Sequence, residues 1–186
     1  MKIKRDRKTE QEYFDKLRKT YADRQREGIH VSDLLDPRLA YFRKIKPLPI
    51  TNAEVGYFLS GEILHLAVQT KLGIPGDWKK VNLGGVEGSI DMPINGFPGE
   101  LKTSRKWTIP DLPEERYVRQ LHSYCAIEKA KTGYVWTFYI APNRTYSGDR
   151  ATTPEFRMWK VDFSPKEIKA ERLRLLQGRT ALLTAL

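Results

Sequence analysis

The 186-residue sequence contains a single cysteine, Cys125. This excludes an internal disulfide framework and any zinc or iron–sulfur site built from four cysteines, so we interpret Cys125 as a buried structural residue. Long apolar runs are also absent, and the longest, such as residues 133–141, are far shorter than the ~20 residues that cross a bilayer. The N-terminus is charged and lacks the apolar segment of a secretory signal. We therefore expect a cytoplasmic, intracellular protein with no membrane partner.

Acidic residues are too few to balance the basic ones. Asp and Glu number 23 against 33 Lys and Arg, which gives a net charge of +10 with histidine neutral. A basic surface attracts polyanions, and nucleic acid is the commonest of these because each neutralised phosphate releases counterions. Charge alone leaves open a basic protein that binds no nucleic acid. The hydrophobic fraction of 40% is enough for a core and excludes disorder throughout the chain.

Internal repeats and low-complexity linkers are absent as well, and the length is typical of one domain. Residues 8–27 are densely charged, with aromatic residues and Leu17 at helical spacing, which predicts an exposed amphipathic helix. We therefore expect a basic amphipathic helix within residues 1–28 and a single domain over residues 29–186.

Hydrophobic periodicity, together with Gly, Pro and capping residues, divides the rest of the chain into helices and strands. The predicted helices cover residues 33–44 with Ser32 as N-cap, 52–72 with Thr51 or Asn52 as N-cap, 113–130 and 165–183. The predicted strands cover residues 78–83, 86–94, 97–103, 134–140 and 155–163, the first three as a meander. This order predicts an α/β fold in which helices pack on a mixed central sheet.

The predicted hairpin over residues 86–103 carries the most informative side chains. A turn at Asn95-Gly96 folds Asp91 back toward Glu100, and the period of a strand puts Glu100 and Lys102 on one face with Leu101 on the other. Two adjacent carboxylates repel unless a cation such as Mg²⁺ lies between them, and a nearby lysine can steady a phosphate or a water. The alternative is an ordinary charged strand face in solvent.

Two small residues and one histidine accompany this hairpin. Gly99 is unusual within a strand and indicates a close approach of the backbone. His65 lies on the predicted helix 52–72, where a neutral imidazole would favour Mn²⁺ beside Mg²⁺. Gly61, one turn earlier, would let this face approach the sheet closely. The alternative for His65 is a half-buried ring bonded to a backbone carbonyl.

Further polar side chains could contact a nucleic acid. Gln120 and Tyr124 lie one turn apart on the predicted helix 113–130, and both are neutral hydrogen-bonding groups suited to positioning a strand. Arg105, Lys106 and Trp107 follow the strand that carries Lys102, so they could grip phosphates and stack on a base. Surface polar residues and a basic loop with a core tryptophan are the alternatives.

Taken in chain order, these residues form a series of spaced pairs. The pairs are Gly61-x3-His65, Gly88-x2-Asp91, Glu100-x-Lys102 and Gln120-x3-Tyr124. The series resembles the PD-(D/E)XK nuclease superfamily, and more narrowly its RecB-like exonuclease branch, which includes CRISPR-associated nucleases. The similarity covers about residues 31–140, and the predicted element order agrees with the α-β-β-β-α-β core of that family, extended by extra helices at both ends.

The resemblance implies a role for each matched residue. Asp91 and Glu100 would be carboxylate ligands of Mg²⁺ or Mn²⁺, and His65 and the main-chain carbonyl of Leu101 would complete the protein ligands. Lys102 would be the catalytic lysine. His65 would therefore be both a metal ligand and a catalytic residue.

The resemblance further implies that Gln120 and Tyr124 orient a DNA strand. The chain departs from the CRISPR-associated branch because Cys125 alone cannot hold that branch's iron–sulfur cluster, so no cluster is expected. The implied activity is metal-dependent hydrolysis of DNA, first as an exonuclease acting on DNA ends. A structure-selective endonuclease and a non-catalytic DNA-binding subunit of a repair or defence complex are the alternatives, and a homo-oligomer is left open.

Overall fold

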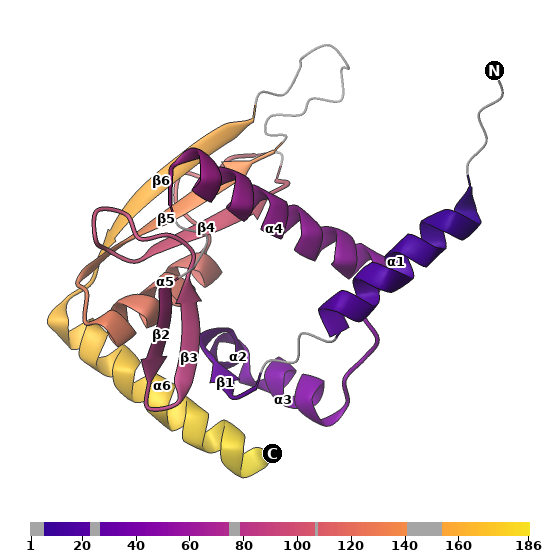
Figure 1. The fold of residues 1–186 in the computed structure, drawn as a ribbon. Helices are drawn as coiled ribbons and strands as arrows, with labels where there is room; N and C mark the ends of the chain where they lie inside the picture. Colours follow the sequence, from indigo (N-terminus) through magenta and orange to yellow (C-terminus); the bar gives the residue numbers. More distant parts are fainter. Residues whose placement is uncertain (1–5, 23–26, 75–78, 107, 141–153) are drawn as a thin grey trace.

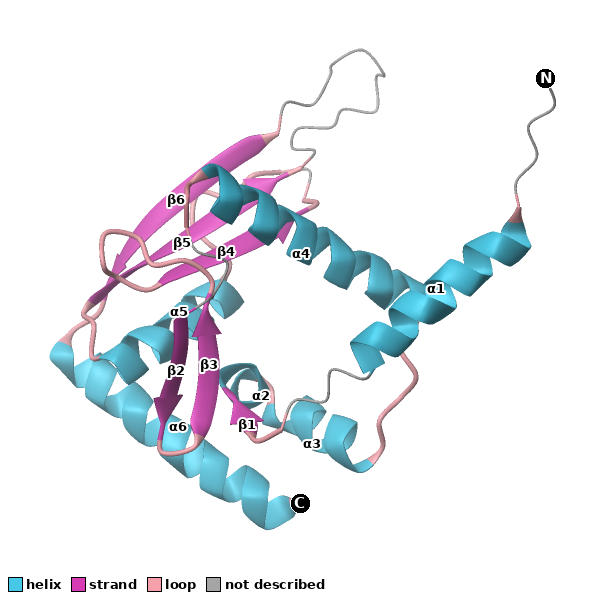
Figure 2. Cartoon of the chain, in the orientation of Figure 1, coloured by secondary structure: helices cyan, strands magenta, loops and turns pink. Residues whose placement is uncertain are grey.

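The structure is a computed structural model that describes residues 6–22, 27–74, 79–106, 108–140 and 154–186. Within these ranges the helices are α1 (Arg7–Ala22), α2 (Val31–Leu35), α3 (Pro37–Ile45), α4 (Asn52–Lys71), α5 (Glu115–Glu128) and α6 (Pro165–Ala185). The strands are β1 (Ile29–His30), β2 (Lys79–Leu83), β3 (Val86–Ile90), β4 (Gly99–Ser104), β5 (Thr132–Tyr139) and β6 (Glu155–Asp162). Helices pack around mixed sheets, which confirms the predicted α/β class (Figures 1 and 2).

The strands form two sheets, whereas the sequence predicted one central sheet that began with a meander. β3 lies between β1 and β2, parallel to the first and antiparallel to the second. β5 lies between β4 and β6, again parallel to the first and antiparallel to the second. The expected β2–β3 hairpin is therefore confirmed, but β4 pairs along its length with β5. The two-residue β1 was not predicted at all.

A tight turn connects the two sheets where the sequence predicted a long hairpin. Asn95 and Gly96 have φ values of 51° and 80°, and the peptide groups of Ile94 and Phe97 bond to each other across the turn. Pro93 and another proline at position 98 lie on either side of this short bridge. Because proline donates no ladder hydrogen bond, the pairing stops soon after the turn and β4 is free to join β5.

The predicted helix over residues 33–44 is in fact two helices. Pro37 disfavours a helical conformation at the residue before it, and Asp36 has φ −138° and ψ 80°. The Asp36 carboxylate accepts a hydrogen bond from the Leu39 N–H at 3.0 Å and so begins α3. Ser32 is not an N-cap, because α2 already begins at Val31 after His30.

Helices α1 and α4 pack against each other in the N-terminal part of the fold. Thr51 caps α4 through a capping box with Glu54, which decides between the two expected caps. α1 ends at Ala22, and the remainder of its predicted range includes residues 23–26, which are outside the described residues. α1 packs on α4 where the ring of Tyr21 lies 5.4 Å from that of Phe58. Among the described helices, none has both the length and the apolar character that a bilayer crossing requires.

Helix α5 connects the two hydrophobic clusters of the molecule. One of its sides contributes Tyr124 and Ile127 to a cluster with the first sheet, α2, α3 and α6. Its other side contributes Leu121 and Cys125 to a cluster beneath β5 and β6. Cys125 is fully buried, as predicted, and burial raises the pKa of its thiol to about 12.

Candidate active site

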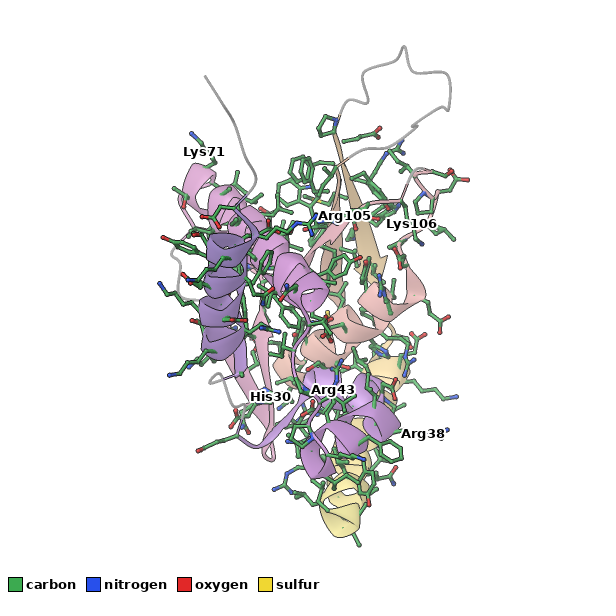
Figure 3. All side chains as sticks on the ribbon, turned by 90° about the vertical axis from the view of Figure 1, so that its right-hand side faces the viewer. His30, Arg38, Arg43, Lys71, Arg105 and Lys106 are labelled. Atoms are coloured by element: carbon green, nitrogen blue, oxygen red, sulfur yellow. The ribbon has the colours of Figure 1, made fainter. Side chains whose placement is uncertain are left out.

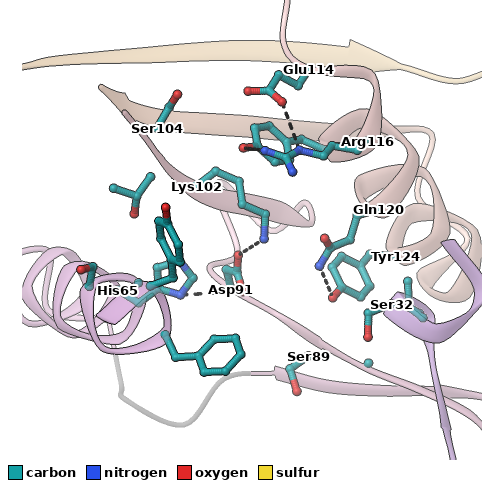
Figure 4. A pocket seen from close by; sticks show the side chains of 18 of the residues that line it. Ser32, His65, Ser89, Asp91, Lys102, Ser104, Glu114, Arg116, Gln120 and Tyr124 are labelled. Atoms are coloured by element: carbon teal, nitrogen blue, oxygen red, sulfur yellow. Dashed lines mark hydrogen bonds and ion pairs between the residues drawn. The ribbon is translucent and has the colours of Figure 1, made fainter. Parts of the chain in front are cut away.

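A cavity of about 930 Å³ opens where the two sheets meet. Residues of α4, of β3 and β4, of the start of α2 and of α5 line its wall. Figure 4 shows these side chains converging from segments far apart in the sequence. Most of the sequence-predicted site residues line this one cavity: His65, Asp91, Lys102, Arg105, Lys106, Gln120 and Tyr124.

The two predicted carboxylates lie close to each other, with Asp91 in the cavity wall and Glu100 behind it. Asp91 directly follows β3, and its Oδ2 accepts a hydrogen bond from the Leu101 N–H of β4 at 3.0 Å. Glu100, the residue before Leu101 on β4, is fully buried. A Cβ at Gly99 would lie 2.2 Å from the Met92 carbonyl oxygen, so only glycine permits this approach. The expectation that Gly99 marks a close backbone contact is confirmed.

Lys102 lies between the carboxylates. Its ammonium group forms an ion pair with Glu100 and lies 3.9 Å from Asp91 Oδ2. Burial raises the pKa of Glu100 to about 8, with the Asp91 carboxylate adding to the increase and Lys102 opposing it. Burial alone would lower the pKa of Lys102, but the two carboxylates outweigh this and raise it. Burial therefore disfavours the ionised form of Glu100, and that form depends on a nearby cation.

His65 reaches this cluster from α4. Its Nε2 lies 3.0 Å from the main-chain oxygen of Leu101, and its Nδ1 lies 4.0 Å from Asp91 Oδ1. The contact with a carbonyl is the alternative considered from the sequence, yet that carbonyl belongs to the residue implied as a metal ligand. The close approach expected at Gly61 is not found, because a Cβ added there would meet no described atom within 4 Å.

Gln69 is a site residue that the sequence did not indicate. It lies one turn after His65 on α4, is buried, and donates a hydrogen bond from Nε2 to the main-chain oxygen of Asp91 at 2.9 Å. This bond fixes the backbone of Asp91 relative to His65. The only available signal was the spacing of four residues from His65, which places both side chains on one helix face.

Gln120 and Tyr124 lie on the α5 side of the cavity. Gln120 Nε2 donates a hydrogen bond to Tyr124 Oη at 2.9 Å. The Tyr124 ring packs on Gly88, where an added Cβ would lie 2.7 Å from the ring and 3.2 Å from Val31. The glycine of the Gly88-x2-Asp91 pair is therefore required for the position of Tyr124, a role that the sequence alone did not reveal.

Arg105 and Lys106 lie at the end of β4 and reach opposite walls of the cavity. The Arg105 guanidinium lies over the Tyr57 ring of α4 at 5.2 Å, and Lys106 pairs with Glu114 beside α5 at 3.1 Å. In the view of Figure 3, Arg105 and Lys106 lie above Arg43 and Arg38. Trp107, the third residue of the predicted segment, lies outside the described residues.

The site has ligands suited to a divalent cation but does not present them as an open metal cage. Across the described ranges, no three His, Cys, Asp or Glu side chains are grouped closely enough to hold an ion as they stand. The Lys102 ammonium group lies between the carboxylates, where its positive charge takes the place of a metal ion. Glu100 Oε2 is buried and accepts no hydrogen bond from a described residue. Hard oxygen ligands of this kind fit Mg²⁺ or Mn²⁺.

Comparison with known proteins gives a fold but no activity. No family model and no curated protein matches the sequence. Among solved structures, the chain is similar to the crystal structure of SSO0001, with a TM-score of 0.59 and 22% sequence identity over 94% of this chain and 86% of that one. A likeness at this identity shows that the two proteins share a fold.

Proposed function

We propose that the protein is a divalent-metal-dependent deoxyribonuclease with a PD-(D/E)XK core, acting as an exonuclease on DNA ends. The observation that carries this proposal is the meeting of Asp91, Glu100 and Lys102 with His65 and the Leu101 carbonyl beside one cavity. Burying two carboxylates together is unfavourable unless a cation compensates them, so an arrangement of this kind is typical of a catalytic site.

The proposed metal ligands are the carboxylates of Asp91 and Glu100, the imidazole of His65 and the main-chain oxygen of Leu101. A bound divalent cation would polarise the scissile phosphate and lower the pKa of the attacking water. Gln69 holds the main chain of Asp91, and the Leu101 N–H holds its Oδ2, so the carboxylate is oriented before substrate arrives.

Lys102 is the proposed catalytic lysine. In the free protein its ammonium group contacts Glu100 and lies 3.9 Å from Asp91 Oδ2. Release from this ion pair would leave Lys102 Nζ free to donate hydrogen bonds to a phosphate oxygen or to orient the attacking water. Gln120 and Tyr124 supply an amide and a phenol on the α5 side of the cavity. These two groups would position the DNA strand relative to Lys102.

The test is cleavage of end-labelled single- and double-stranded linear DNA, with a closed circle beside them, in Mg²⁺, Mn²⁺ or EDTA. We expect metal-dependent loss of the linear DNA alone, and a loss of at least about 100-fold in rate for Asp91→Asn and Glu100→Gln. Asp162→Asn removes an exposed carboxylate of β6 and serves as the matched control. Cutting of the circle would indicate an endonuclease, and binding without cleavage would indicate a DNA-binding subunit.

A further inference from the structure

A second charged cluster lies on the cavity wall at the start of α5. Glu114 bridges two cations: its Oε1 lies 3.1 Å from Lys106 Nζ, and its Oε2 lies 3.1 Å from Arg116 Nε. All three residues line the cavity that holds the candidate active site. Figure 4 shows Glu114 and Arg116 at the edge of the cavity beyond Lys102.

Tyr117 connects this cluster to the candidate active site. The Arg116 Nη2 donates a hydrogen bond to Tyr117 Oη at 2.8 Å, and the guanidinium lies 4.7 Å from the centre of the ring. Lys102 Nζ lies 5.9 Å from the same ring centre. Tyr117 is buried, so it fixes Arg116 at a set position relative to the proposed catalytic lysine.

The solvent exposure of the two cations indicates that each can leave Glu114 and pair with another anion. The side chains of Lys106 and Arg116 are 54% and 70% exposed, whereas that of Glu114 is 16% exposed. An exposed ion pair contributes little to stability. A contribution to folding therefore does not account for the two ion pairs that Glu114 forms. Each oxygen of the Glu114 carboxylate pairs with one cation. A phosphate bound between two basic side chains would occupy the same position.

We propose that Lys106 and Arg116 bind a backbone phosphate next to the scissile one, and that Glu114 occupies this subsite in the free protein and competes with the strand. The inference rests on the proposed function, because it places the subsite relative to the catalytic Lys102. Glu114 keeps the two cations in position while DNA is absent, and the incoming phosphate replaces its carboxylate. Removing the charge of Glu114 should therefore strengthen DNA binding, whereas removing either cation should weaken it.

Binding is measured in EDTA by fluorescence anisotropy, using labelled oligonucleotides without terminal phosphates over a range of salt concentrations. We expect Lys106→Ala and Arg116→Ala each to weaken binding about tenfold and to lower the salt slope by about 1. We expect Glu114→Gln to tighten binding several-fold. A gain of affinity is informative because a misfolded variant does not produce one.

The matched controls lie on β6. Lys160 is 55% exposed and pairs with Asp162 at 3.2 Å, and neither residue lines the cavity. Lys160→Ala and Asp162→Asn therefore make the same changes of net charge as Lys106→Ala and Glu114→Gln. If the cavity variants match these controls, or if Glu114→Gln weakens binding, the subsite does not exist.

A single neutral methylphosphonate locates the subsite on the strand. Moved stepwise along the oligonucleotide, it should weaken binding to the wild type at the phosphate that Arg116 contacts, and should have no further effect there on Arg116→Ala. Equal effects in both proteins at every position would overturn the proposal. These outcomes differ from failure of the proposed function, in which the wild type would show no metal-dependent cleavage in the assay above.

Discussion

Two buried glutamates show how the surroundings of a single residue decide its role. Glu171 lies between α5 and α6, where burial alone would raise its pKa, but hydrogen bonds from Arg174 and Ser123 outweigh burial and lower it. Glu100 is also buried, yet burial dominates and raises its pKa to about 8. Glu171 is therefore an ion-paired structural group, whereas Glu100 is a carboxylate held at a cost in stability.

This difference leads to a pH dependence of stability in the metal-free protein. Between the ordinary pKa of 4.5 and the folded value of about 8, Glu100 holds a proton in the folded state and loses it on unfolding. Stability then falls as pH rises through this range, because the folded state binds more protons. We expect Tm, measured in EDTA from pH 5 to pH 8.5, to decline more in the wild type than in Glu100→Gln.

The comparison of the two proteins removes the contribution of all other groups. Glu171→Gln serves as the control, since the lowered pKa of Glu171 affects stability only at acidic pH, where falling pH removes it. A decline in Tm of equal size in wild type and Glu100→Gln would show that Glu100 is ionised throughout this range. Such a result would contradict the inferred cost of its burial.

Single elements differ in how well the sequence predicted them. Elements bounded by strong local signals were placed well: the capping box at Thr51 begins α4, and Asn95-Gly96 forms the expected turn. The break at Asp36 also has a local cause in Pro37, which the periodicity of the apolar residues concealed. The pairing of β4 with β5 joins residues that are 35 apart in the sequence, and no local pattern specifies that choice.

In the candidate site, too, the features that depend on local sequence were predicted and the contacts between elements were not. The strand period put Glu100 and Lys102 on one face, and the turn brought Asp91 to them. Contacts between elements could not be foreseen, because they depend on how helices pack against strands. Gln69 bonds to the backbone of Asp91, and Arg116 is fixed by Tyr117, through tertiary geometry of this kind.

Helix α4 carries two glycines that nothing in the described structure requires. Gly56 and Gly61 lie inside the helix, and a Cβ at either would meet no described atom within 4 Å. Alanine has the higher helix propensity because glycine loses more backbone entropy on folding. We expect Gly56→Ala and Gly61→Ala each to raise the free energy of unfolding by about 0.5–1 kcal/mol, measured by urea denaturation.

Gly88→Ala is the contrasting variant for this measurement. Its new Cβ would lie 2.7 Å from the Tyr124 ring, so either the ring or the strand must shift. We expect this variant to lose about 1–3 kcal/mol of stability. If the α4 variants were destabilised to the same degree, the helix face at Gly56 and Gly61 would have to be packed more closely than the structure indicates.

At the scale of the whole molecule, the candidate site lies where separate parts of the fold meet. Asp91 follows the first sheet, Glu100 and Lys102 belong to the second, and His65 comes from α4. The tight turn after β3 and helix α5 connect the two sheets. A ligand that bonds to residues of all three parts would therefore stabilise their mutual arrangement as well as the site itself.

We therefore expect Mn²⁺ to raise the Tm of the whole chain in the absence of DNA. A ligand that binds only the folded state adds about 2.7 kcal/mol at 100 times its Kd, which for a chain of this length corresponds to roughly 5–10 °C. The increase should be larger at pH 8.5 than at pH 6, because Glu100 must lose its proton before it can act as a ligand.

The variants decide whether this stabilisation arises at the proposed site. Asp91→Asn and Glu100→Gln should lose most of the increase in Tm, and His65→Ala should lose part of it, whereas Asp162→Asn should keep all of it. An equal increase in every protein would mean that Mn²⁺ binds elsewhere on the surface. No increase in the wild type would mean that the free protein does not bind Mn²⁺ at this site, which would contradict the proposed set of ligands.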